Sequence, residues 1–110
     1  MANKRQLKKA ICRTCGDVAG ECIFAADAFG TEENYEKWDM IIIDVAMLQG
    51  EAVKKVSTAF DKQPKDFANA KEFNKAHRAF AKQTVKAISE LMTSKLQEVA
   101  GKMNELMPKN

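Results

Sequence analysis

The sequence predicts an all-α fold: an up-down antiparallel bundle of three long helices in a single domain that spans residues 1–110. The chain has 110 residues, 45% hydrophobic and 30% charged, which is enough for one core without disulfides or metals. Two prolines and five glycines leave few places to turn. Apolar residues recur at helical spacing, and good helix formers dominate the composition.

The first predicted helix spans residues 4–29. Asn3 is the expected N-cap, and Gly30 is expected to end the helix in the left-handed conformation. Thr31 is then expected to cap the second helix. A connection this short requires the two helices to lie antiparallel. The first helix has one apolar face, made of Leu7, Ile11, Thr14, Cys15, Val18, Cys22, Ala25, Ala26 and Phe29.

The second predicted helix has the clearest pattern in the chain. At about 100° per residue, its apolar positions fall within an arc of roughly 160°. Pro64 is expected to end this helix near Lys62, because the residue before a proline disfavours helical geometry. The face consists of Tyr35, Trp38, Ile41, Ile42, Val45, Leu48, Ala52, Val53, Val56 and Phe60.

The third predicted helix begins after a cap at Asp66 or Asn69 and continues to about Met107. One long helix is favoured, and a break within residues 89–94 or at Gly101 would create a fourth. A third helix of about 60 Å exceeds the other two, so we expect its C-terminal part to fold back or to pack on a second subunit. Its apolar stripe is Ala81, Val85, Ile88, Met92, Leu96, Val99, Met103 and Leu106.

A second apolar surface is predicted on the rear of the first two helices. Mid-helix glycines on one face suggest close approach of another backbone, and an apolar row across two helices indicates an interface. We therefore expect a homodimer or another protein partner. In one alternative the C-terminal segment of the same chain covers this surface, and in the other it is ordinary solvent-exposed surface. The predicted interface residues are Gly16, Gly20, Phe24, Met40, Ile43 and Met47.

Charge is distributed unevenly along the chain, although the net charge is only +3. The turn near Gly30 is expected to form an acidic pole, and the opposite end a basic pole. A basic pole predicts an alternative function, nucleic-acid binding, although lysine outnumbers arginine and the aromatic residues are expected in the core. The basic pole is Lys4, Arg5, Lys8, Lys9, Lys54, Lys55, Lys62, Lys65, Lys71, Lys75 and Arg78.

No motif predicts catalysis, a cofactor or a bound metal. Cys12 and Cys15 have C-x-x-C spacing, but mid-helix placement and the distance to Cys22 favour packing over a redox or metal role. His77, the only histidine, is expected at the core edge with a local hydrogen bond. The odd number of cysteines and the lack of a continuous apolar stretch indicate a cytoplasmic protein without a membrane span.

The opening residues Met1-Ala-Asn-Lys-Arg-x-Leu-Lys-Lys-x-Ile, with Cys15 and the pair Glu21-Cys22, resemble the start of a family of small bacterial all-helical proteins of unknown function. The resemblance covers about the first 25 residues and implies helical layout, with no activity, cofactor or catalytic residue. We expect a non-enzymatic interaction or structural protein that self-associates.

Overall fold

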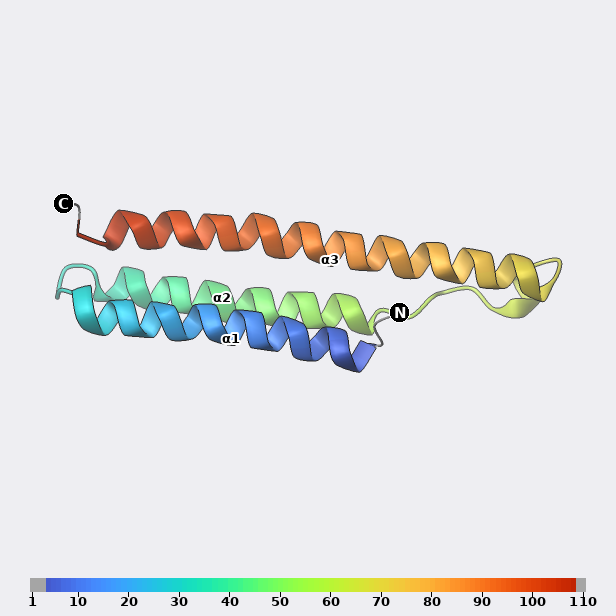
Figure 1. Ribbon diagram of the computed structural model, residues 1–110, viewed down its shortest axis with the longest axis horizontal. Coiled ribbons are helices and arrows are strands. Elements are labelled where there is room, and N and C mark those ends of the chain that lie inside the picture. Colours follow the sequence, from blue (N-terminus) through green and yellow to red (C-terminus); the bar gives the residue numbers. More distant parts are fainter. Residues whose placement is uncertain (1–3, 109–110) are drawn as a thin grey trace.

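The computed structural model describes residues 4–108, and every regular element within them is helical. The elements are α1 (Lys4–Phe29), α2 (Tyr35–Ser57), a short 3-10 helix η1 (Pro64–Asp66) and α3 (Ala70–Leu106). Figure 1 shows an elongated molecule in which α1 lies beside α2 and α3 lies along the same pair. The molecule measures 63 × 20 × 20 Å, so few side chains lie deep inside it.

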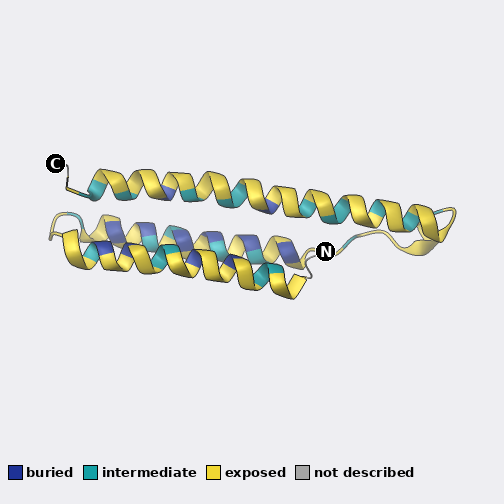
Figure 2. Ribbon diagram, in the orientation of Figure 1, coloured by how far each residue is buried: buried dark blue, intermediate teal, exposed yellow. Residues whose placement is uncertain are grey.

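Helix α2 contributes most of the core. Six of its residues are buried, compared with four from α1 and two from α3. Figure 2 shows the difference, because α3 is exposed over most of its length. The largest fully buried side chain is Trp38, followed by Val45, Val56, Cys15 and Cys22. The apolar stripe predicted for the second helix is therefore confirmed as the centre of the core from Trp38 to Val56, whereas Tyr35 is 49% exposed and Phe60 lies beyond the end of α2.

The first helix has the predicted bounds, but Gly30 ends it for a different reason. No glycine among the described residues has a positive φ, so the expected left-handed conformation at Gly30 is wrong. A Cβ atom at this position would strike the carbonyl oxygen of Ala26 and the ring of Tyr35. Glycine is required here because the backbone and a ring approach closely. The predicted cap, Asn3, lies outside the described residues.

The second helix begins later than predicted, at Tyr35, so the expected Thr31 cap is wrong. Residues 31–34 form a turn in which the amide N–H groups of Asn34 and Tyr35 both donate to the Thr31 carbonyl, each at 3.0 Å. The Thr31 amide donates in return to Oδ1 of Asn34 at 2.7 Å. Asparagine often stabilises a turn in this way, and here it delays the helix by several residues.

The second helix also ends earlier than the predicted Lys62, at Ser57. The hydroxyl groups of Ser57 and Thr58 donate to the carbonyls of Val53 and Lys54, at 3.2 and 3.3 Å. Thr58 has an extended backbone, and the chain stays non-helical up to Pro64. Local hydroxyl bonds of this kind compete with helix continuation, so the connection from residue 58 to residue 69 is longer than predicted.

The third helix is one continuous helix, as favoured from the sequence. No fourth α-helix occurs among the described residues. The side chain of Asn69 caps it by accepting from the Glu72 amide at 2.9 Å. The excess length is not at the C-terminal end, where we expected it. Figure 1 shows the first turns of α3 extending past the ends of α1 and α2. We call residues 70–86, the N-terminal part of α3, the overhang; its residues from His77 to Val85 also border a depression with Lys4 and Leu7 of α1 and Val56 of α2.

The connection between α2 and α3 partly covers the overhang. The ring of Phe60 lies 5.9 Å from that of Phe73, 5.4 Å from that of His77 and 5.2 Å from that of Phe80, between centroids. Phe67 adds a contact with Phe73 at 5.6 Å. Aromatic pairs at these separations are favourable. This connection, residues 58–69, is called the strap; it packs against the overhang in place of a folded-back helix.

Candidate functional site

The predicted interface residues with side chains are all exposed. Relative exposure is 75% for Phe24, 56% for Met40, 48% for Ile43 and 67% for Met47. Single exposed apolar residues are common, but several on neighbouring helices form a surface that usually has a partner. The described part of the chain does not cover this surface.

The structure does not gather these residues into one patch. Met40 and Met47 border two surface depressions between α2 and α3, and both depressions include Asp44 and Lys102. Phe24 lies on the opposite side of α1 from the buried row that contains Cys22, since two residues of separation turn a helix by about 200°. The predicted set is therefore divided between the α2–α3 groove and the back of α1.

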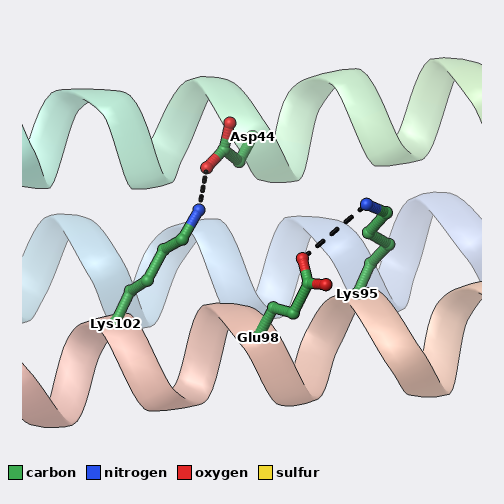
Figure 3. Close-up of polar contacts among 4 residues, drawn as sticks. All are labelled: Asp44, Lys95, Glu98 and Lys102. Carbon is green, nitrogen blue, oxygen red and sulfur yellow. Dashed lines mark hydrogen bonds and ion pairs between the residues drawn. The ribbon is translucent and has the colours of Figure 1, made fainter.

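An ion pair crosses the α2–α3 groove. The Nζ atom of Lys102 lies 3.0 Å from Oδ2 of Asp44, and Figure 3 shows the two side chains meeting between the helices. Within α3, Lys95 and Glu98 pair at 3.7 Å. The hydrogen bond with Asp44 raises the pKa of Lys102. Both pairs are exposed and contribute little to stability, and a protonated amine is unsuited to act as a base or nucleophile.

The two predicted interface glycines face open space. A Cβ atom at Gly16 or Gly20 would meet nothing within 4 Å, so no backbone of the same chain approaches them. Ile23, which was not among the predicted interface residues, is 51% exposed. Its position between Gly20 and Phe24 is the signal that would have added it to the rear face of α1.

The three cysteines have different environments. Cys15 and Cys22 are buried and Cys12 is exposed. The Sγ atom of Cys22 lies 3.5 Å from Sδ of Met103, and the amide of Gln49 lies 3.5 Å from Sγ of Cys12. The described residues contain no cluster of three potential metal ligands. Packing is thus the role that the structure provides for the two buried thiols.

Burial raises the pKa of the Cys15 and Cys22 thiols above the ordinary value of 9.0, with a smaller contribution from Cys12 and Glu21 respectively. We expect the free energy of unfolding to fall as pH rises above about 9, because the unfolded chain releases these protons while the folded chain retains them. Denaturant titrations at pH 8 and pH 10 measure this fall.

The matched control for the thiol prediction is the double variant Cys15→Ala/Cys22→Ala. Its free energy of unfolding should fall less between the two pH values, because the other titrating groups are the same in both proteins. A thiol reagent should also modify Cys12 quickly and the buried pair only after unfolding. Equal pH dependence in parent and variant, or three equally fast thiols, would contradict the prediction.

His77 lies in the aromatic cluster and its side chain is exposed. It contacts the rings of Phe60 and Phe73, at 5.4 and 5.9 Å between centroids. His77 borders a depression with Leu7 of α1 and the buried Val56 of α2, as expected for the edge of the core, although its own side chain is exposed. No acidic side chain in the described residues is paired with the imidazole, so the arrangement lacks the partner that orients a typical catalytic histidine.

The predicted basic residues fall into two groups. Figure 1 places the start of α1 and the end of α2 together, while the start of α3 lies farther out. The first group therefore comes from α1 and α2, and the second from the connection and the overhang. Lys82 and Lys86, which were not among the predicted basic residues, continue the second group. Their spacing of 11 and 15 residues from Lys71 is the helical signal that would have found them.

No helix within residues 4–108 has both the length and the apolar character needed to cross a membrane. Comparison of the chain with protein-family models, curated proteins and solved structures found no match. The resemblance of the opening residues to a bacterial family of unknown function stays a prediction. Any functional assignment must rest on the surfaces of this molecule.

Proposed function

We propose that the protein is a non-enzymatic interaction protein, an up-down antiparallel bundle of three helices that associates with a second copy of itself. The observation that carries this proposal is the exposed apolar row of Met40, Ile43 and Met47 along α2, on a molecule with a thin core; Phe24, on the back of α1, belongs to a separate exposed site. Removing such side chains from water contributes about 25 cal/mol per Å² of apolar area. A second copy presents the same surface, which is the requirement for a symmetric dimer.

Further support comes from Gly16 and Gly20. Each glycine lowers the stability of an isolated helix by about 1 kcal/mol relative to alanine, and both positions have open space for a Cβ atom. Close packing of a helix from the second copy would explain their presence. We also propose a cytoplasmic location, since all three cysteines are free thiols and a reducing compartment keeps thiols in this state.

Solution mass, measured by light scattering, tests the proposal. The chain has a mass of 12.3 kDa, so the parent protein should have about twice this value if it forms a dimer. Met47→Glu should shift the mass to that of one chain and leave the helical circular dichroism signal unchanged, because it places a charge on the buried interface without touching the core.

The matched control is Val85→Glu. Val85 is 50% exposed but belongs to the overhang, away from the proposed face, so this variant should keep the dimer mass. A monomeric parent at micromolar concentration would overturn self-association. Equal loss of the dimer in both variants would place the interface elsewhere.

A further inference from the structure

A row of five basic side chains runs along one side of the overhang. The positions are separated by 4, 3, 4 and 4 residues, so at about 100° per residue they fall within an arc of roughly 80°. At 1.5 Å per residue the row is about 22 Å long. All five side chains are exposed. We call this row the basic stripe, and it consists of Lys71, Lys75, Arg78, Lys82 and Lys86.

The stripe has no ionic partner among the described residues. Within residues 4–108, the two ion pairs that involve α3 lie C-terminal to the stripe. They join Lys102 to Asp44 of α2 and Lys95 to Glu98 within α3. No Asp or Glu occurs between Glu72 and Glu90. Like charges three or four residues apart destabilise a helix by about 0.2–0.5 kcal/mol per pair, and cations near its N-terminus oppose the helix dipole. An external polyanion would offset this repulsion.

The opposite side of the overhang is already occupied. Phe73 and Phe80 face the strap through their contacts with Phe60, and the stripe lies around the helix from them. The fold therefore uses the aromatic side of this segment internally and leaves the basic side open to solvent. This division makes the stripe accessible along its whole length in the single chain.

We propose that the basic stripe binds the sugar–phosphate backbone of duplex nucleic acid without sequence preference. A rigid row of cations matches the regular line of phosphates, whose neutralisation releases bound counterions. Duplex is favoured over single strands because stacking on unpaired bases needs exposed aromatic rings, and the rings of Phe73 and Phe80 are half-buried against that of Phe60. This surface differs from the broad pole predicted from the sequence, since it excludes α1 and α2.

The chemistry of the stripe disfavours a lipid bilayer as partner. A helix that lies on a membrane inserts large apolar side chains beside its basic ones. The apolar residues beside the stripe are Ala79, Ala81 and Val85, and the phenylalanines of this segment point to the strap. Insertion would therefore bury little apolar area, whereas phosphate contacts need only the charges that are present.

Fluorescence anisotropy with a labelled 24-base-pair DNA duplex of arbitrary sequence tests the proposal. With five phosphates neutralised per chain, the slope of log K against log salt should be about −4.5, so affinity should fall about 500-fold between 50 and 200 mM salt. In the triple variant Lys75→Gln/Arg78→Gln/Lys82→Gln the slope should be about −1.8, and affinity should fall only about 12-fold over the same range.

The matched control removes three exposed lysines outside the stripe, as Lys9→Gln/Lys54→Gln/Lys55→Gln. It has the same net charge as the stripe variant and should keep the parent slope. Glutamine is a good helix former, so circular dichroism should show intact helices in both triple variants. This control separates a defined surface from general attraction by net charge.

Four results would overturn the proposal. They are no binding to the duplex at 20 mM salt, equal effects of the two triple variants, tighter binding to a single strand of the same length, and binding only to phosphatidylserine vesicles. The last result would assign the stripe to a membrane surface. Because the stripe lies outside the proposed dimer face, Met47→Glu should keep the slope per chain, so loss of self-association and loss of DNA binding are distinguishable.

Discussion

Replacing Trp38 by alanine is expected to lower the free energy of unfolding by about 3–5 kcal/mol. Trp38 is completely buried and is the largest fully buried side chain, so its removal leaves a cavity in a thin core. A small domain has a total stability of about 5–15 kcal/mol, and this variant should therefore be partly unfolded at modest temperature. Urea titration followed by circular dichroism measures the loss.

The control for this prediction is Trp38→Phe, which keeps most of the ring. The indole N–H of Trp38 is buried and has no hydrogen-bond partner within residues 4–108, and an unsatisfied buried donor costs about 1–3 kcal/mol. Phenylalanine removes that unsatisfied donor, and this gain offsets part of the stability that is lost with the smaller ring. We expect Trp38→Phe to be clearly more stable than Trp38→Ala. Equal losses in the two variants would contradict this interpretation of the core.

Phe60→Ala is expected to release the strap and melt the overhang while the core remains folded. Phe60 makes ring contacts with Phe67, Phe73, His77 and Phe80, so its removal takes away the centre of the cluster. The expected loss is about 2 kcal/mol, below that of a fully buried phenylalanine. Hydrogen exchange should accelerate in residues 70–86 and stay slow near Trp38.

Phe67→Ala is the matched control for the strap. Phe67 contacts only Phe60 and Phe73 among the described rings, so its removal should accelerate exchange in the overhang less than Phe60→Ala does. If both variants left exchange in the overhang unchanged, helix propensity rather than the strap would hold this segment. These two variants also bear on the proposed nucleic-acid binding, because the basic stripe forms a straight row only while the overhang is helical.

The candidate surfaces were predicted only in part. The spacing of Met40 and Met47 identified them as a second apolar row, and both are exposed. Their neighbours were not predictable, because the depressions that they border include Asp44 and Lys102, which are 58 residues apart in sequence. A helical repeat shows which residues share a face of one helix, but it does not show which helix lies opposite.

The sequence by itself determined the helical class, the bounds of α1 and the continuity of α3, because each depends on residues within a few turns of one another. It left the cap of α3 open between Asp66 and Asn69, and the structure places it at Asn69. Only the tertiary structure decided where α2 ends relative to α3, and therefore that Val85 is exposed and that Lys82 and Lys86 belong to an open stripe. Helix α2 ends early, at Ser57. Local hydroxyl bonds favour this end, and the chain that follows makes ring contacts with α3, which is distant in sequence. Contacts between residues far apart in the chain have no local pattern, so their consequences appear only once the helices are packed.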